Sequence, residues 1–284
     1  MSPPPRLAVL LSILAFGLAA CGDDDEPAGG AATTQANSCA KNQLDLKQAG
    51  TLTIGTDKPA FPPYFQDNDP TNGRGFESAV AYAVARKLGF SKEEVTWTTV
   101  PFNSSYAPGP KQFDFDINQI SITPQRAERV DFSEPYFTAP QAVVALESSP
   151  AADAADLAAL KDVRLGVQVG TTSLEAVQAS IQPDEDPQVF NDSNDTVRAL
   201  KNGRVDAIVV DLPTAFFLTD VEIPEAAIVG QFPAPGGDDW GLLLEKGSPL
   251  TPCVNEAVTE LRGEGTLQRL QEDYMGGDVA PELR

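Results

Sequence analysis

Hydrophobic residues recur along the chain with two different periods. Segment 51–57 alternates apolar and polar residues as a half-buried strand does, whereas 76–89 spaces its apolar residues along one helical face and stops at Gly89. The same patterns predict strands at 51–57, 95–100, 113–121, 163–169, 205–211 and 240–247, and helices at 76–89, 123–129, 171–181, 196–203, 252–262 and 265–274. Strands that alternate with helices predict an α/β fold with mostly parallel sheets.

Two proline-rich turns, near 133–140 and 231–237, interrupt this alternation. They lie where the chain can cross between two lobes. We expect one lobe from residues 41–140 and 238–284, and a second from 141–237. The two crossings would form a hinge.

The N-terminus has the layout of a secretory signal. Arg6 precedes an apolar run over 7–20, which is shorter than the roughly 18–20 residues that a membrane-spanning helix needs. A membrane anchor is the alternative, but the LAAC sequence at 18–21 resembles the bacterial lipobox. We therefore expect a signal peptide over 1–20, a lipid-bearing Cys21, and a disordered, acidic tether over 21–40.

Removal of the signal leaves two further cysteines, Cys39 and Cys253, in an exported and potentially oxidising compartment. They are either both free and buried or paired. The oxidising compartment and the even number of cysteines favour a disulfide.

Composition excludes several classes of function. The 284 residues include no histidine, which removes Ser-His-Asp and Cys-His catalysis and His-ligated metals. The formal net charge of −21, without a basic run, argues against binding to nucleic acid. We expect neither a cofactor nor a metal ion. We also expect the protein to be a monomer.

Polar side chains follow four of the expected strands. In open α/β sheets small ligands bind beyond the carboxyl ends of strands. The residues at these ends are Asp57, Ser121 with Arg126, Thr172, and Asp211. A guanidinium with free N–H groups can hold a carboxylate, and carboxylates with a hydroxyl can hold an ammonium. The set is suited to a zwitterion.

Each of these residues also has a purely structural interpretation. Thr172 and Glu175 have the spacing of a capping box. Arg126 can pair with Glu128 or Asp131 on the surface, and the aspartates can form turns. The coincidence of complementary charges at four strand ends favours a binding site.

The motifs GTD, GFE, SITPQRAERVDFSEPYF, GVQVGTTS, GRVDAIVVD and GTLQRLQEDY occur in this order between residues 50 and 275. They resemble the polar amino-acid-binding proteins of ABC transporters, which have the two-lobed type II periplasmic-binding fold. The resemblance implies two α/β lobes that close on a free amino acid and deliver it to a membrane permease.

The resemblance also implies roles for single residues. Arg126 matches the residue that holds the ligand α-carboxylate, helped by the backbone of Ser121 and Thr172. Asp211 and the Ser121 hydroxyl match the ligands of the α-ammonium. Asp57 matches a position that contacts the ligand side chain, and Phe61 the aromatic that covers it.

Three features depart from the family pattern. Asn118 and Gln119 replace small residues and can enter the pocket, and Asp116 stands at an ordinarily apolar position. Segment 102–112 is short, and its proline and glycine residues break the helix expected there. These departures bear on the identity of the substrate.

The sequence therefore predicts a lipid-anchored, extracytoplasmic receptor for a polar or basic amino acid, and not an enzyme. One alternative is an enzyme that resembles cyclohexadienyl dehydratases, with Glu77 or Glu134 as general acid of raised pKa. Another is a ligand-sensing partner of a membrane protein.

Overall fold

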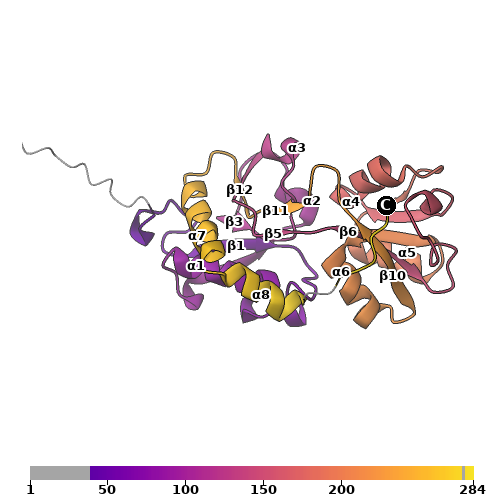
Figure 1. Cartoon of the computed structure of the whole chain (residues 1–284). Helices are drawn as coiled ribbons and strands as arrows, with labels where there is room; N and C mark the ends of the chain where they lie inside the picture. The colour runs from indigo at the N-terminus through magenta and orange to yellow at the C-terminus, as the bar shows by residue number, and fades with distance from the viewer. Residues whose placement is uncertain (1–38, 277–278) are drawn as a thin grey trace, which may run out of the picture. The chain divides into compact units, whose positions relative to one another are not determined.

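Two mixed sheets organise the chain in the computed structural model, which describes residues 39–276 and 279–284 (Figure 1). The expected signal peptide, Cys21 and the tether up to residue 38 lie outside the described residues. The strands are β1 Leu52–Thr56, β2 Val95–Thr99, β3 Phe115–Asp116, β4 Val130–Phe132, β5 Phe137–Thr138, β6 Gln141–Leu146, β7 Leu165–Gln168, β8 Gln188–Phe190, β9 Ala207–Asp211, β10 Ala226–Phe232, β11 Asp239–Trp240 and β12 Leu243–Glu245. The α-helices are α1 Phe76–Lys87, α2 Phe102–Ser105, α3 Pro124–Ala127, α4 Thr172–Ala176, α5 Ser193–Lys201, α6 Leu212–Phe217, α7 Thr251–Gly263 and α8 Thr266–Met275. Single π-helical turns, Val177–Ile181 and Leu218–Glu222, extend α4 and α6.

Lobe 1 is built on the sheet β2-β1-β3-β12-β4. Strand β1 is parallel to β2 and to the central strand β3, whereas β12 is antiparallel to β3 and β4. Helices α1, α7 and α8 pack against one another beside this sheet. Ile54, Phe76 and Phe115 are completely buried in the core that forms between them. This core holds the ends of β1 and β3 in place.

Lobe 2 is built on the sheet β10-β6-β9-β7-β8. Strand β7 is parallel to β8 and β9, whereas β6 is antiparallel to β9 and β10. Each sheet is therefore half parallel and half antiparallel, and the expectation of mostly parallel sheets needs this correction. Strands β6 and β12 come soon after a hinge crossing, so they enter their sheets without the helical crossover that a parallel strand requires.

The two hinge crossings run side by side. Strands β5 and β11 form a short antiparallel ribbon, and the N–H of Ala139 donates to the carbonyl of Asp238 over 2.9 Å. The Trp240 and Phe137 rings pack with their centroids 4.8 Å apart. The proline-rich turns of the sequence therefore lie where the lobes are joined.

The segment predicted as a strand over 113–121 is extended only at Phe115–Asp116. The Asp114 carboxylate accepts hydrogen bonds from the backbone N–H groups of Lys47 and Thr53, over 2.8 and 2.6 Å. Gln119 has a left-handed backbone with φ of 49°. The chain consequently turns after β3 and does not continue along the sheet.

The hydrophobic pattern does not predict β6, α6 and β10. Strand β6 reads QAVVAL and is buried over its first five residues, so it lacks the alternation of a half-buried strand.

The helix expected over 123–129 is present as the short α3, where the Thr123 hydroxyl accepts a hydrogen bond from the N–H of Arg126 over 3.2 Å. Thr123 is thus its N-terminal cap.

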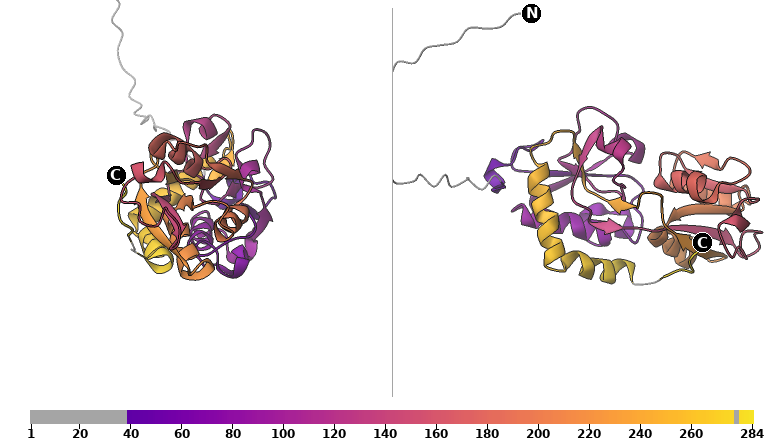
Figure 2. Two further views of the ribbon diagram at one scale, coloured as in Figure 1. Left: turned by 90° about the vertical axis from the view of Figure 1, so that its right-hand side faces the viewer. Right: turned by 45° about the horizontal axis from the view of Figure 1, so that its top comes forward.

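The C-terminal segment 279–284 lies on lobe 2, although residues 238–284 were expected in lobe 1 (Figures 1 and 2). The N–H of Gln231 in β10 donates to the carbonyl of Pro281 over 2.7 Å, and the N–H of Leu283 donates to the carbonyl of Gln231 over 2.8 Å. Leu283 is buried in the lobe 2 core. This burial explains why the chain returns to lobe 2 after α8.

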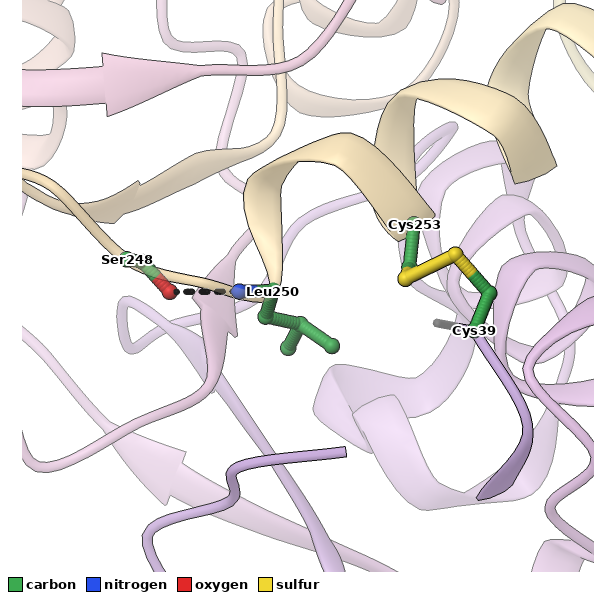
Figure 3. Close-up of a disulfide and its surroundings, with 4 residues drawn as sticks. All are labelled: Cys39, Ser248, Leu250 and Cys253. Atoms are coloured by element: carbon green, nitrogen blue, oxygen red, sulfur yellow. Dashed lines mark hydrogen bonds between the residues drawn. A yellow bond between two sulfur atoms is a disulfide. The ribbon is translucent and has the colours of Figure 1, made fainter. Parts of the chain in front are cut away.

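A disulfide joins Cys39 to Cys253 in α7, with their Cα atoms 5.3 Å apart (Figure 3). It is the pair that the sequence analysis favours. The bridge attaches the first described residues to the core of lobe 1. Within residues 39–276 and 279–284, no helix combines the length and apolar character needed to cross a membrane.

Candidate functional site

A cavity of about 210 Å³ lies between the two lobes. Six of the seven expected ligand-binding residues line it: Asp57, Phe61, Gln119, Ser121, Thr172 and Asp211. The seventh, Arg126, is not among the lining residues. The volume is below the roughly 300–1,000 Å³ of pockets for drug-sized molecules, and it fits a small solute.

Side chains of the two lobes meet around this cavity. The Tyr64 hydroxyl of lobe 1 is 2.9 Å from the Thr214 hydroxyl of lobe 2. The Phe61 and Phe217 rings face each other with centroids 6.3 Å apart. The Ser121 and Thr172 hydroxyls are 3.2 Å apart. These contacts hold the lobes in a closed arrangement over the cavity.

Two carboxylates, the partly buried Asp211 and the buried Asp238, lie together at the hinge side of the site. Nε2 of Gln141 donates to Oδ1 of Asp211 over 2.7 Å and to Oδ2 of Asp238 over 2.5 Å. Oδ2 of Asp238 also accepts from the Thr172 hydroxyl over 3.0 Å. Oδ1 of Asp238 is buried and has no hydrogen-bond partner among the described residues. Asp238 is not among the residues that line the cavity, and it reaches the lining through the Thr172 hydroxyl.

Burial raises the pKa of Asp211 well above its ordinary value, and the negative charge of Asp238 raises it further. Burial also raises the pKa of Asp238, although the hydrogen-bond donors around this carboxylate lower the pKa in part. Two carboxylates at one place repel each other when both are ionised. An ammonium bound beside Asp211 in the cavity would relieve this repulsion and favour both charges.

Arg126 connects the lobes from behind the cavity. Its Nη1 donates to the carbonyl of Ser121 over 2.8 Å, and its Nη2 donates to the carbonyl of Gly170 over 2.9 Å. Its guanidinium lies 4.7 Å from the Tyr106 ring and 5.5 Å from the Phe102 ring. Burial lowers its pKa from the ordinary value. A guanidinium carries five N–H donors, so these two contacts leave donors for an anion.

Gly170 is required by this arrangement. Its backbone is left-handed, with φ of 74°, and a Cβ atom there would lie 2.5 Å from the Tyr106 hydroxyl and 2.6 Å from Oδ1 of Asn103. Glycine lets the lobe 2 backbone approach lobe 1 closely enough for its carbonyl to reach Arg126.

The capping interpretation of Thr172 does not hold in the structure. Thr171 is the N-terminal cap of α4, and its hydroxyl accepts from the N–H of Leu174 over 3.3 Å. The Thr172 hydroxyl is instead directed to Asp238 and Ser121. Thr172 therefore belongs to the polar centre of the site.

Asp57 and Phe61 lie at the lobe 1 edge of the cavity. Asp57 accepts from the N–H of Lys58 over 2.6 Å and from the N–H of Phe102, at the start of α2, over 3.0 Å. It has a structural role in addition to its place in the lining. Asn118 and Gln119 also line the cavity, as their bulk predicts.

Sequence reasoning missed Asp238, Gln141 and the contacts of Glu77. Asp238 follows Gly236 and Gly237 directly at a hinge crossing, and a carboxylate at that place is the signal that could have found it. Glu77, considered only as a general acid, accepts from the backbone and side chain of Gln119 and from the Tyr136 hydroxyl. Asp116 is completely buried beside β1, so it does not enter the cavity.

Known proteins resemble the chain over most of its length. Residues 52–277 match the bacterial extracellular solute-binding proteins, family 3. The L-cystine-binding protein TcyJ of Escherichia coli strain K12 is 32% identical over 237 residues, which cover 82% of this chain and 86% of that protein. The solved structure of an ancestral arginine-binding protein bound to arginine has 33% identity and a TM-score of 0.67, and covers 80% of this chain and 99% of that one.

A further solved structure is the ancestral amino acid-binding protein AncCDT-1, a precursor of cyclohexadienyl dehydratase. It has 29% identity and a TM-score of 0.65, and covers 80% of this chain and 95% of that one. The relatives are binding proteins, so the fold and the closed cleft define a two-lobed solute-binding protein and not an enzyme. The chain belongs to family 3 of the bacterial extracellular solute-binding proteins. The predicted resemblance and fold class are confirmed.

Proposed function

We propose that this protein captures a free polar amino acid outside the cytoplasm and delivers it to the permease of an ABC transporter. The observation that carries the proposal is the convergence of Asp211, Ser121 and Thr172 from both lobes on one small cavity, with Asp238 bound to the Thr172 hydroxyl behind its lining. Asp238 lies behind Thr172, and its negative charge favours an ammonium of the ligand in the cavity. The closed lobes would then be stabilised by a ligand that contacts both of them.

Arg126 is proposed to hold the α-carboxylate. Its guanidinium already bonds a carbonyl of each lobe, so a carboxylate bound to its remaining donors would link closure to ligand capture. Because a buried guanidinium and carboxylate form strong, charge-assisted hydrogen bonds, we expect Arg126→Ala to lose a hundredfold or more in affinity, equivalent to about 3 kcal/mol.

The side chain of the ligand is proposed to be polar or basic. Four carboxylates line the cavity at Asp57, Asp192, Asp211 and Glu222, against the single ammonium of Lys58 among the described lining residues. L-Cystine and L-arginine, which relatives bind, are accordingly the first ligands to test.

The predicted signal peptide and lipobox extend the proposal. Cleavage before Cys21 and lipidation of its thiol would attach the protein to the outer face of the cell membrane, with residues 21–40 as the tether. A monomer is expected. Mass spectrometry of the purified protein would detect the lipid on Cys21, and Cys21→Ala should release the protein from the membrane fraction.

A thermal-shift screen of the amino acids with L-cystine tests capture, because a ligand that binds only the folded protein raises the melting temperature. Isothermal titration of the strongest hit against Arg126→Ala and Asp211→Asn tests the site, with the exposed Glu134→Gln as matched control. We expect the control to bind normally. Normal binding by both site variants would overturn the assignment, and uptake of the labelled hit by cells without the protein would test delivery.

A further inference from the structure

Glu77 occupies an unusual position for a carboxylate. It lies in the first turn of α1 and is completely buried. Its Oε1 accepts from the N–H of Gln119 over 2.7 Å and from the Tyr136 hydroxyl, and its Oε2 accepts from Nε2 of Gln119. All three donors are neutral groups. The carboxylate is therefore satisfied by hydrogen bonds and not by an ion pair.

Gln119 stands between this carboxylate and the ligand cavity. Its backbone is left-handed, which is uncommon for a residue other than glycine, asparagine or aspartate, and the hydrogen bond to Glu77 holds that conformation. Gln119 lines the cavity, two residues before Ser121. A side-chain amide has one end that accepts hydrogen bonds and one that donates them. The end bound to Glu77 decides which end is left for the cavity.

We propose that Glu77 sets the orientation of the Gln119 amide, so that the ionised carboxylate leaves the amide oxygen for the ligand and the protonated acid leaves the amide NH2. This inference rests on the proposed function, because it concerns the selection of ligands by the same cavity. Glu77 acts through Gln119 and is a positioning residue.

Hydrogen-bond geometry requires this reorientation. Oε1 of Glu77 already receives a fixed backbone N–H, so an added proton is best placed on Oε2. That proton would face the Nε2 hydrogens of Gln119. Rotation of the amide by half a turn lets its oxygen accept the proton and restores the hydrogen bond. An unrotated amide would leave two donors opposed in a buried place, which is costly.

The surroundings of Glu77 make its protonation accessible near neutral pH. Burial raises its pKa to about 7, against the opposing effects of the Tyr136 and Gln119 donors. The titratable groups that face it are Tyr136, Tyr64, Asp116 and Asp211, and none of them is a cation. The carboxylates among them disfavour a further negative charge when they are ionised.

Ligand preference should therefore change with pH. Above pH 7 the cavity presents the amide oxygen, which favours a guanidinium or ammonium on the ligand side chain. Below pH 7 it presents the amide NH2, which favours a carboxylate. Exchange of a matched hydrogen bond for a mismatched one corresponds to about a tenfold change in affinity.

The first test needs no ligand. In 15N-labelled protein, the side-chain amide signal of Gln119 is assigned by its absence in Gln119→Leu and followed from pH 5.5 to 8.5. We expect a shift with a midpoint near pH 7 that is absent in Glu77→Gln. A signal that does not titrate, or that titrates equally in Glu77→Gln, would overturn the inference.

The second test compares L-arginine with L-glutamate by isothermal titration at pH 5.5 and 8.5. We expect the ratio of their affinities to fall about tenfold at the lower pH in the wild type and to stay constant in Glu77→Gln, whose amide imitates the protonated acid. Glu134→Gln should keep the wild-type change. A constant ratio in the wild type counts against the inference.

The two tests separate this inference from the proposed function. If neither amino acid binds, the ligand assignment fails while the amide signal still decides the role of Glu77. If binding occurs without titration of Gln119, the proposed function stands and the inference fails.

Discussion

Asp211 and Asp238 share one hydrogen-bond donor, Nε2 of Gln141, although Asp211 ends a strand of lobe 2 and Asp238 lies in the chain that returns to lobe 1. The pair therefore lies at the junction on which the lobes turn. Since Asp238 is buried and Asp211 is partly buried, water screens the repulsion between them less than it would at the surface. Removal of one of these charges should therefore weaken ligand binding but increase the stability of the ligand-free protein.

Asp238→Asn should weaken ligand binding by about tenfold, because the ammonium loses the attraction of a negative charge behind Thr172. The same substitution should raise the free energy of unfolding of the ligand-free protein, because one of two buried like charges is removed. Isothermal titration and urea unfolding measure the two effects. Asp239→Asn, one residue further along, is the matched control and should change binding little. Equal loss of affinity in both variants would contradict the role of Asp238.

Glu77 should make the protein less stable as the pH rises. Its pKa is raised from 4.5 to about 7 in the folded protein. The folded state therefore keeps a proton that the unfolded state loses, and stability falls between about pH 4.5 and pH 7. At about 1.4 kcal/mol per pKa unit, the loss is about 3 kcal/mol.

Urea unfolding at pH 5 and pH 8 measures this loss. Glu77→Gln cannot ionise and should remove that part of the pH dependence, whereas Glu134→Gln should retain it. If the difference in stability between wild type and Glu77→Gln does not change with pH, the raised pKa is wrong.

Leu283→Ala should destabilise lobe 2. The side chain is 4% exposed in the lobe 2 core, and a buried leucine reduced to alanine costs about 2–5 kcal/mol. Because the end of a chain can move to fill part of the cavity, we expect a loss of stability near the lower end of this range. Hydrogen exchange at Gln231 should also increase, since its N–H donates to the same segment.

Two further variants test how residues 279–284 pack on lobe 2, one that should disturb the packing and one that should not. Gly230→Ala should resemble Leu283→Ala, because its Cβ atom would lie 2.6 Å from Cγ of Leu283. Val279→Ala changes an apolar residue that is 81% exposed and should have almost no effect. Equal stabilities of Leu283→Ala and Val279→Ala would contradict the packing.

Removal of the disulfide should lower the free energy of unfolding by about 2–5 kcal/mol, because the bridge closes a loop of 214 residues in the unfolded chain. The double variant Cys39→Ser, Cys253→Ala tests this by urea unfolding. Neither cysteine lines the cavity, so ligand affinity should be preserved. Reductant should destabilise the wild type and leave the double variant unchanged. If reductant left the wild type unchanged, the disulfide would not contribute to its stability.

Much of the candidate site could be predicted because its residues follow local signals. Asp57 and Asp211 end strands with clear hydrophobic patterns, and Thr172 begins a helix after a glycine. The structure brings both aspartates and Thr172 to one cavity. Arg126 could be predicted as a nearby cation, but its backbone partners in both lobes could not.

The sequence by itself determined the alternation of strands and helices and the residues at the strand ends, because these depend on the spacing of neighbouring side chains. Only the tertiary structure decided that β6 and β12 run antiparallel and that Leu283 returns to lobe 2. It likewise decided that Gln141 meets Asp238, 97 residues away in the chain. Such contacts depend on which surfaces are buried together and which polar groups then need partners, and local periodicity contains neither.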